Sequence, residues 1–554
     1  MAKPTRYTPE LYLEYTKKGF WGSMILSDYW DKNGREYPDM EALVDSRTRL
    51  TWLQANLWID RVALGFIELG IKRDDLIILA LPHSTELILL RVACERAGIL
   101  CMPIPMAWRY REIEHVVNIT RPVGVVTNKE YRGFGYLQMF QSVCSKELRH
   151  IFLIDDRVDE RALSIKEMAE RDAENDFPPD FLNEKKLRSD EFSLIQTTTG
   201  TTGFPKLVEN PICSRICMAK SFIKKYKLTT EDIIGLLIPS SGGLNHVAYF
   251  GAPILPVKVV ILEHFTAEKA FKLIEKERIT FAGIVPAALE KILKHPDRIK
   301  YDLSSLRTMC CGASALSYEL GAEVEEKMGF PIVQNFGAMD SGGWTGHQPD
   351  DPFEVRYRTL GKPFDGNEIR IVGDNGKEVE SGEIGELHVR GPNLGSGYYL
   401  DPVSTWKAWS KEGWYRSGDL GRLDKHGNLT LAGRIRDMII RGGQNIYPIE
   451  IENLLRDHPR ISDVAVVAMP DPVMGERACA YVVLNEPGCQ FTFKEMISFL
   501  KEKAIALYKL PERLEVVNSL PKVGDYTKTD KKVLEEEIRE KLKEEGSGTS
   551  LFNS

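Results

Sequence analysis

The sequence predicts an α/β protein, with a large N-terminal domain of two α/β sheet subdomains and a β-rich subdomain, followed by a small α+β C-terminal domain. Apolar, strand-like runs alternate with helical stretches over most of residues 1–360. Short strands separated by turns follow residue 361, and helices alternate with strands again after residue 433. The length of 554 residues agrees with this division, because one hydrophobic core rarely organises so long a chain.

The N-terminal part repeats a strand–helix order. Its first half has a predicted helix at 84–97 and predicted strands at 75–81, 100–105, 123–127 and 151–154. Its second half has predicted helices at 267–277 and 287–293 and predicted strands at 233–238, 259–262, 281–285, 306–311 and 332–336. This order predicts mainly parallel sheets, with ligand sites beyond the carboxyl ends of the strands.

The predicted secondary-structure pattern changes twice in the last third of the chain. Strands at 368–372 and 385–389 are each followed by a turn, which indicates a β-rich subdomain. The remainder predicts a small α+β domain, with helices at 449–456 and 493–506 and strands at 464–468 and 480–483.

Composition excludes several classes of function. The chain has 73 Lys and Arg against 80 Asp and Glu, a net charge of −7, and no large basic block, so nucleic acid is not an expected partner. No uncharged apolar run approaches the length of a membrane span. The nine cysteines lack paired metal spacing and the N-terminus lacks a secretory signal, so we expect reduced thiols in a cytoplasmic protein.

The segment Gln196–Leu207 is the most informative stretch. It holds five threonines, two glycines, one proline and one lysine, without an acidic residue. Glycines let a backbone turn and present its N–H groups, and hydroxyls and a lysine add donors and charge, so the segment is typical of a polyphosphate-binding loop. Pro205 and Leu207 flank Lys206, whereas a Walker-type loop needs Gly-Lys-Ser/Thr, so a Walker-type ATPase is disfavoured. The alternative is a flexible Thr/Gly linker.

Four further motifs follow in order. Gly312-Ala-Ser314 and Asn335-Phe-Gly-Ala-Met-Asp340 each come after a predicted strand, and the lone Asp340 carboxylate is what a Mg²⁺ ligand requires. Trp414–Leu420 contains Asp419, which is suited to accept hydrogen bonds from a ribose diol. Gly433–Asn445 carries three arginines among glycines. Each motif alone is also compatible with an ordinary turn, and their conjunction carries the argument.

Together these motifs resemble the AMP-forming, adenylate-forming superfamily, which includes acyl-CoA ligases, adenylation domains and beetle luciferases. The resemblance covers nearly the whole chain. It implies an N-terminal domain at 1–433, a hinge at 434–436 with Arg436, a mobile C-terminal domain at 437–545 and a flexible tail at 546–554.

The resemblance also implies roles for individual residues. It assigns ATP and AMP binding to Thr198, Thr199, Gly200, Thr201, Thr202, Gly203, Lys206, Gly312, Ala313, Ser314, Asn335, Phe336, Gly337, Asp419 and Arg434. It assigns the metal to Asp340, coenzyme A to Gly442 and Gly443, and catalysis to Lys528 and Lys206.

Two departures from the family pattern stand out. Met339-Asp340 occupies the place of the usual Thr-Glu, which removes a hydroxyl and shortens the metal-binding carboxylate. The C-terminal lysine motif, Leu520-Pro-Lys-Val-Gly-Asp-Tyr-Thr-Lys528, is one residue longer than usual and has no glycine before the lysine. Lys528 is the candidate catalytic lysine, and Lys522 is the alternative.

The activity implied is an AMP-forming acyl-CoA ligase. It would activate a carboxylic acid with ATP and Mg²⁺ to acyl-AMP and pyrophosphate, then transfer the acyl group to coenzyme A, and the same residues would support the reverse reaction that makes ATP. The segment after 233–238 suggests a compact acyl pocket, formed by Asn245, His246, Tyr249, Met339 and Trp344, which favours a cyclic or aromatic acid such as benzoate or cyclohexane carboxylate. The alternatives are an adenylating enzyme that loads a carrier protein and a non-catalytic nucleotide-binding homologue.

Overall fold

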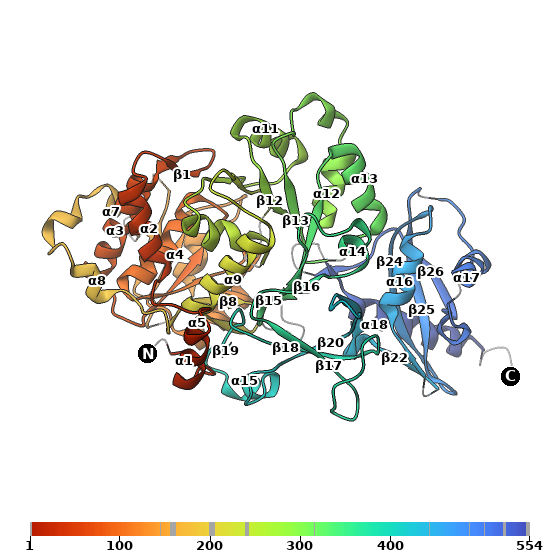
Figure 1. Cartoon of the computed structure of the whole chain (residues 1–554). Helices are drawn as coiled ribbons and strands as arrows, with labels where there is room; N and C mark the ends of the chain where they lie inside the picture. Colours follow the sequence, from red (N-terminus) through yellow and green to blue (C-terminus); the bar gives the residue numbers. More distant parts are fainter. Residues whose placement is uncertain are drawn as a thin grey trace.

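A computed structural model of the chain describes residues 3–143, 146–155, 162–198, 205–238, 243–314, 316–442, 444–486, 488–503, 505–523 and 528–549. In Figure 1 the part of the chain coloured from red to green forms the larger body, and the blue C-terminal part forms a smaller body at one side. The predicted large α/β region followed by a small α+β region is confirmed.

An eight-stranded sheet organises the first part of the chain, in the order β19-β9-β8-β4-β3-β5-β6-β7. Its strands are β3 (Leu76–Ala80), β4 (Leu100–Pro103), β5 (Gly124–Thr127), β6 (His150–Leu153), β7 (Leu163–Ser164), β8 (Phe192–Thr197), β9 (Leu207–Pro211) and β19 (Gly397–Tyr398). The strands from β8 through β7 are parallel. At the other edge β8, β9 and β19 are antiparallel, so the predicted phosphate loop connects two antiparallel strands.

A nine-stranded sheet follows, in the order β16-β15-β14-β13-β12-β10-β11-β1-β2. Its strands are β1 (Glu41–Val44), β2 (Arg49–Thr51), β10 (Ile234–Leu236), β11 (Val259–Ile261), β12 (Phe281–Ile284), β13 (Thr308–Cys311), β14 (Ile332–Ala338), β15 (Gly342–Gly346) and β16 (Lys362–Pro363). The interior strands from β14 to β1 are parallel, as predicted. The edge strands β2, β15 and β16 are antiparallel, which the strand–helix order did not predict.

Helices pack against both sheets. They are α1 (Pro9–Lys17), α2 (Leu26–Glu36), α3 (Trp52–Glu68), α4 (Thr85–Ala97), α5 (Tyr110–Thr120), α6 (Tyr136–Ser142), α7 (Ile165–Glu170), α8 (Phe181–Lys185), α9 (Ile212–Lys225), α10 (Ala252–Ile254), α11 (Ala267–Glu277), α12 (Pro286–Lys294), α13 (Tyr318–Met328), α14 (Phe353–Arg358) and α15 (Pro402–Ala408). Helix α4 is typical: the Ser84 hydroxyl accepts the Leu87 N–H at its start, and Gly98 ends it with a left-handed φ of 78°. One hydrophobic core joins the two sheets, since it contains Leu79 of β3 and Val260 of β11.

The predicted β-rich subdomain is a four-stranded antiparallel sheet in the order β17-β18-β20-β21. Its strands are β17 (Glu368–Val372), β18 (Gly385–Arg390), β20 (Tyr415–Leu423) and β21 (Leu429–Arg434). Its hydrophobic cluster also contains Val208 of β9 and Trp344 of β15, so this sheet packs against the edges of the other two.

The C-terminal domain has a five-stranded sheet of β22 (Ile439–Arg441), β23 (Gln444–Ile446), β24 (Ile461–Asp471), β25 (Gly475–Leu484) and β26 (Arg513–Val516). Its helices are α16 (Pro448–Arg456), α17 (Phe493–Glu502) and α18 (Lys531–Thr549), and β27 (Lys522–Val523) pairs with β28 (Lys528–Thr529). Alternate residues of β24 face opposite sides: Val464 and Val466 belong to one hydrophobic cluster, and Ala465 and Val467 to another. Neither cluster contains a residue that precedes Ile439.

The end of the chain differs in part from the expected tail. Helix α18 continues to Thr549, so residues 546–549 extend a helix. Residues 550–554 lie outside the described residues.

Candidate active site

A cavity of about 1260 Å³ lies where the carboxyl ends of β8, β13 and β14 meet the β-rich sheet and helix α16. It is lined by residues from all five predicted motifs, namely Thr198, Lys206, Gly312, Asn335, Asp340, Asp419 and Arg434. This position agrees with the rule that ligands bind beyond the carboxyl ends of parallel strands. The structure therefore brings together residues that are up to 236 positions apart (434 − 198).

The two ends of the predicted phosphate loop, Thr198 and Lys206, are hydrogen-bonded to each other. The Thr198 N–H donates to the Lys206 carbonyl at 2.9 Å, and the Lys206 N–H donates to the Thr198 hydroxyl at 3.1 Å. Thr199, Gly200, Thr201, Thr202 and Gly203 lie outside the described residues. Both ends of the loop, Thr198 and Lys206, line the cavity.

The Gly312–Ser314 turn follows β13 and lines the same cavity. A Cβ atom on Gly312 would stand 2.9 Å from the Asn335 carbonyl oxygen, so only glycine fits this crossing. Ala313 has a φ of 69°, in the left-handed region that a residue with a side chain rarely adopts. Such strain is concentrated at functional sites, which agrees with the predicted nucleotide-binding role.

The next strand, β14, supplies Asn335, Phe336 and Gly337, which all line the cavity. The Asn335 amide donates to the Tyr226 hydroxyl at 3.2 Å, which fixes the orientation of this side chain. A Cβ atom on Gly337 would lie 2.1 Å from the Gly342 carbonyl oxygen, so the close crossing of β14 and β15 requires glycine.

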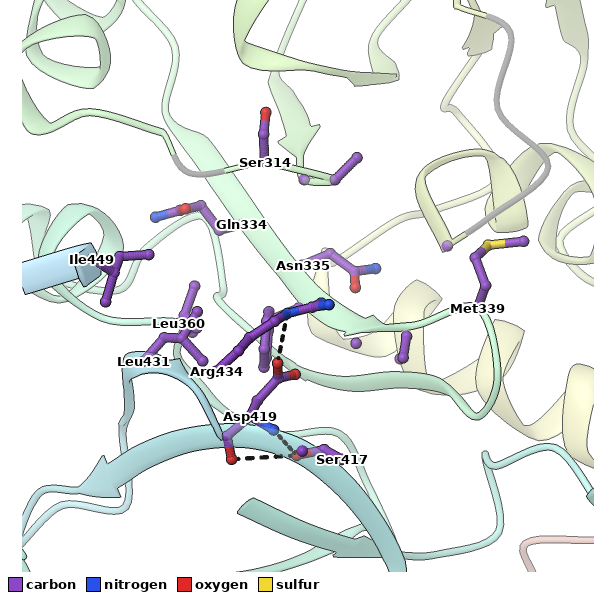
Figure 2. Close-up of a pocket in the computed structure, with 18 of the residues that line it drawn as sticks. Ser314, Gln334, Asn335, Met339, Leu360, Ser417, Asp419, Leu431, Arg434 and Ile449 are labelled. Atoms are coloured by element: carbon purple, nitrogen blue, oxygen red, sulfur yellow. Dashed lines mark hydrogen bonds and ion pairs between the residues drawn. The ribbon is translucent and has the colours of Figure 1, made fainter. Parts of the chain in front are cut away.

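Asp419 and Arg434 form the best-defined polar pair of the cavity. They are direct partners across β20 and β21, and the Arg434 Nε lies 3.0 Å from the Asp419 Oδ1 (Figure 2). The Asp419 side chain is 7% exposed, whereas that of Arg434 is 44% exposed. Figure 2 shows both in the same region as Ser314 and Asn335, as nucleotide binding requires.

Glu386 of β18 also lines the cavity beside this pair. Its carboxylate accepts the Gly418 N–H at 3.2 Å and lies 3.0 Å from His388 Nε2. The contact with His388 lowers the pKa of the Glu386 carboxyl, so this side chain is ionised at neutral pH.

Asp340 is held by a tyrosine that the sequence motifs did not single out. The Tyr398 hydroxyl donates to the Asp340 Oδ2 at 2.5 Å, and the Lys206 ammonium lies 4.3 Å from the centre of the same ring. Burial raises the pKa of Tyr398, which keeps the phenol protonated as a donor. Tyr398 ends the glycine-rich segment Arg390-Gly-Pro-Asn-Leu-Gly-Ser-Gly-Tyr398, and this local composition is the signal that could have identified it.

Asp340 alone would serve Mg²⁺ as a protein ligand. Within the part of the chain that is described, no group of three His, Cys, Asp or Glu side chains is placed to hold a metal ion. A single carboxylate fits Mg²⁺ in a nucleotide site, because this ion usually takes one or two carboxylates together with substrate phosphates and water.

The residues expected in the acyl pocket divide into two groups. His246 and Met339 line the cavity. Asn245, Tyr249 and Trp344 are not among its lining residues and lie buried behind the wall, at 2%, 4% and 0% exposure. There the Asn245 amide donates to the Ile238 carbonyl, the Tyr249 hydroxyl contacts His83 Nδ1 and the Trp344 Nε1 donates to the Ser341 hydroxyl.

Arg215 of α9 lines the cavity and was not predicted from the sequence. The only local signal is a charged residue within the largely apolar start of that helix, Ile-Cys-Ser-Arg-Ile-Cys-Met-Ala. An amphipathic helix commonly carries such residues on its solvent face, so the pattern did not indicate that this one is buried.

The C-terminal domain reaches the cavity through α16. The described lining residues from this domain are Ile449, Asn453, Leu454, Arg456 and Asp457, and Arg436 of the expected hinge lines it too. Gly442 has a left-handed φ of 55° and does not line the cavity, and Gly443 lies outside the described residues.

The two candidate lysines lie on the β27–β28 hairpin. Lys522 Nζ donates to Asp463 Oδ2 at 2.6 Å and to the Thr529 hydroxyl at 3.2 Å, so this lysine is held within its own domain. Lys528 pairs through its backbone with Val523, and its side chain lies outside what is described.

Comparisons with known proteins agree with this geometry. A family model described as AMP-binding enzyme matches residues 30–399, and one described as AMP-binding enzyme C-terminal domain matches residues 450–531. The 2-hydroxy-7-methoxy-5-methyl-1-naphthoate–CoA ligase of Streptomyces carzinostaticus is 32% identical over 96% of this chain and 97% of its own. The medium-chain fatty-acid–CoA ligase of Escherichia coli K12 is 30% identical over 95% of this chain and 93% of its own.

A solved anthranilate CoA ligase in complex with anthranoyl-AMP superimposes with a TM-score of 0.82 over 94% of this chain and 98% of its own, at 21% identity, which shows a shared fold. Within the described residues, no helix is long and apolar enough to cross a membrane. Since the family models match most of the chain and relatives at 30% identity or more span nearly all of it, the protein belongs to the AMP-binding enzyme family and is an adenylate-forming ligase.

Proposed function

We propose that this protein is an AMP-forming acyl-CoA ligase for a compact, ring-bearing carboxylic acid. It would convert the acid and ATP to acyl-AMP and pyrophosphate, and then transfer the acyl group to coenzyme A with release of AMP. The observation that carries the proposal is the convergence of the Asp419–Arg434 pair, Lys206 and Asp340 on one cavity of about 1260 Å³.

The first half-reaction joins two anions. A carboxylate oxygen of the acid attacks the α-phosphorus of ATP, and the bond from that phosphorus to the pyrophosphate oxygen breaks. No proton is transferred, so alignment and charge neutralisation dominate the barrier. Lys206 would provide positive charge at the base of the phosphate loop, and Asp419, which lines the same cavity, would accept hydrogen bonds from the ribose.

Two further groups complete this step in the proposal. Mg²⁺, when bound at Asp340, would neutralise the charge that develops on the phosphate oxygens. Lys528 would contact both the acid and the nucleotide from the β27–β28 hairpin. The shorter carboxylate of Asp340 is held by Tyr398 at 2.5 Å, which gives it a defined orientation.

The second half-reaction needs a different set of neighbours. The coenzyme A thiolate attacks the acyl carbonyl, the carbonyl–phosphate bond breaks, and AMP leaves. A lysine that aligns the acid would then obstruct the thiol, so the two steps call for two placements of the C-terminal domain. Arg436 is the proposed pivot, and Gly442 and Gly443 are the proposed contacts of the pantetheine arm.

The acid end of the cavity supports a compact substrate. His246, Met218, Leu244 and Met339 line it, and Trp344 and Tyr249 fill the space behind it. The relatives point in two directions, because one is a naphthoate–CoA ligase and another a medium-chain fatty-acid–CoA ligase. We favour a ring acid because the His246 ring lines this end and the buried rings of Tyr249 and Trp344 stand behind it.

The decisive experiment measures AMP release and acyl-CoA formation with benzoate, cyclohexane carboxylate, hexanoate and palmitate, with and without coenzyme A. The proposal expects AMP release that depends on coenzyme A and is fastest with a ring acid. A clear preference for palmitate would contradict the ring acid. Pyrophosphate exchange without thioester formation would favour an enzyme that loads a carrier protein, and no exchange with any acid would favour a non-catalytic homologue.

A further inference from the structure

A buried arginine faces the acid end of the cavity. Arg215 belongs to α9 and is 4% exposed, and it lines the cavity with Met218 of the same helix and with His246. The strand opposite supplies Gly342: a Cβ atom there would stand 3.1 Å from the Arg215 Nη2. The absence of a side chain at Gly342 therefore lets the guanidinium pack closely beside β15 in the wall of the cavity.

This guanidinium has no anionic partner among the described residues. Its Nη2 donates to the Asn393 carbonyl at 2.8 Å and its Nε to the Ser214 hydroxyl at 3.3 Å. Both acceptors are neutral, and no ion pair joins Arg215 to a carboxylate in the described part of the chain. Burial lowers the pKa of Arg215 to about 10, which leaves it charged at neutral pH.

The surroundings add no negative charge. His246 donates through Nε2 to the Arg215 carbonyl at 2.8 Å, and burial lowers the pKa of this histidine well below its usual value, so it is neutral. Its ring stacks on Phe250 at 4.6 Å, and a second buried arginine, Arg91, lies 5.2 Å from the Phe250 ring. The acid end is thus bordered by one cation that has no anionic partner among the described residues, and Arg91 lies behind it.

An unpaired buried charge is costly to the folded protein, because the cation loses its hydration and no anion replaces it. Proteins normally compensate such a charge with a carboxylate. Among the described residues none supplies a carboxylate to Arg215, so the compensating anion is expected from the ligand. A planar guanidinium is well matched to a carboxylate, which it can bind through two hydrogen bonds.

We propose that the acid substrate carries a second carboxylate, which Arg215 binds while the first is activated. The inference rests on the proposed ligase activity and narrows its substrate class from compact ring-bearing acids in general to those that carry two carboxylates. His246 lies beside the same point as a neutral ring, so it would contact the substrate without competing for its charge.

The ATP phosphates are a weaker match for Arg215. The phosphate loop has its own cation in Lys206, and the nucleotide residues Asp419 and Arg434 come from the β-rich sheet. Arg215 is instead packed on Met218, Gly342 and His246, at the acid end.

The first test compares matched acids on the wild-type protein. Pyrophosphate exchange is measured with benzoate against the 1,2-, 1,3- and 1,4-benzenedicarboxylates, and with cyclohexane carboxylate against its 1,2-, 1,3- and 1,4-dicarboxylates. We expect at least one dicarboxylate to exceed its monocarboxylate by about 10²-fold in kcat/KM, as a charged hydrogen-bonded contact would give. Monocarboxylates that equal or exceed every dicarboxylate would overturn the proposal.

The second test uses Arg215→Met, with Lys220→Met on the exposed face of the same helix as the matched control. Calorimetry with the preferred dicarboxylate and, separately, with ATP measures binding without turnover, so it remains informative if no acid is activated. We expect Arg215→Met to weaken dicarboxylate binding by about 10²-fold and to leave ATP binding unchanged, while Lys220→Met changes neither. Unchanged dicarboxylate binding, or a loss of ATP binding in the folded variant, would contradict the assignment.

Arg215→Lys tests whether a loss of dicarboxylate binding in Arg215→Met comes from the lost charge or from a change in packing. It retains the charge and loses the paired geometry, so dicarboxylate binding should fall between the wild type and Arg215→Met. If Arg215→Lys and Arg215→Met bind the dicarboxylate equally, the contact is not a charge–charge interaction and the proposal fails.

Discussion

Tyr398 donates a hydrogen bond to Asp340 across 58 residues of sequence, with 2.5 Å between the two oxygens. The same ring lies under the Lys206 ammonium, 4.3 Å from its centre. One phenol thus contacts both the carboxylate that would hold Mg²⁺ and the lysine of the phosphate loop. The desolvation that raises the pKa of Tyr398 makes it a permanent donor over the working pH range.

Replacing Tyr398 with Phe is expected to raise the Mg²⁺ concentration needed for half-maximal pyrophosphate exchange by about 5- to 10-fold. The reason is that the Asp340 carboxylate loses the hydrogen bond that orients it. The measurement is a Mg²⁺ titration at saturating ATP. Tyr399→Phe is the control, since this neighbouring ring packs on Phe192 instead. An unchanged titration would show that Tyr398 does not position Asp340.

Asp419→Ala should reduce kcat/KM for ATP by about 10²-fold or more, since it removes a buried acceptor and leaves Arg434 without its partner at 3.0 Å. Pyrophosphate exchange over a range of ATP concentrations measures the effect. Arg422→Ala on the same strand is exposed and should behave like the wild type. If ATP binding survives the loss of Asp419, this residue does not contact the nucleotide.

Lys528→Ala is expected to abolish adenylation and to leave thioester formation from supplied acyl-AMP largely intact. Lys522→Ala is the matched control on the same hairpin, because the Lys522 ammonium is held by Asp463 at 2.6 Å. Adenylation and thioester formation are assayed separately for both variants. Equal loss of the two half-reactions in Lys528→Ala, or a loss of adenylation only in Lys522→Ala, would exclude Lys528 as the aligning lysine.

His347 should make the protein less stable in mild acid. It is fully buried, and burial lowers its pKa to about 3. Its Nδ1 accepts from the Gln334 N–H and its Nε2 contacts the Thr359 hydroxyl, which suits the neutral ring. At pH values between the folded pKa and the unfolded pKa of about 6.5, only the unfolded chain binds the proton. The free energy of unfolding therefore decreases by about 1.4 kcal/mol for each unit by which the pH is lowered in this range.

The test compares thermal unfolding at pH 7 and pH 5. His347→Gln should lose less of its Tm over this range than the wild type, although its Tm at pH 7 is lower because two buried contacts change. His426→Gln, on an exposed turn, should leave the pH dependence as it is. An identical pH dependence in His347→Gln and the wild type would refute this account.

Much of the fold could be predicted because strands and helices carry local patterns. Helix α11 and strand β17 begin and end where their sequences predict. The antiparallel edges were not predictable in the same way, since the pairing of β2 with β1 or of β9 with β19 depends on partners that local periodicity does not identify.

The residues of the cavity also divide into those that the sequence identified and those that it did not. Gly312, Asn335, Asp340, Asp419 and Arg434 were identified from motifs, and they converge as expected. Tyr249 and Trp344 were placed in the acyl pocket by proximity in sequence, but they lie behind its wall, because large aromatic rings next to a cavity are readily covered by smaller neighbours. Arg215 escaped detection since a single arginine in a helix gives no sign of whether it faces solvent or the interior.

The separate clusters of the C-terminal domain have a practical consequence. Because neither contains a residue that precedes Ile439, we expect the segment that follows Arg436 to be exchangeable between homologues. The corresponding segment of a homologue could be grafted after Arg436. Among the described residues of that segment, only those of α16 and Asp457 line the cavity, so the graft would change the cavity wall only there. We therefore expect recombination at this junction to join the cavity walls of the N-terminal part of one parent to the C-terminal domain of another.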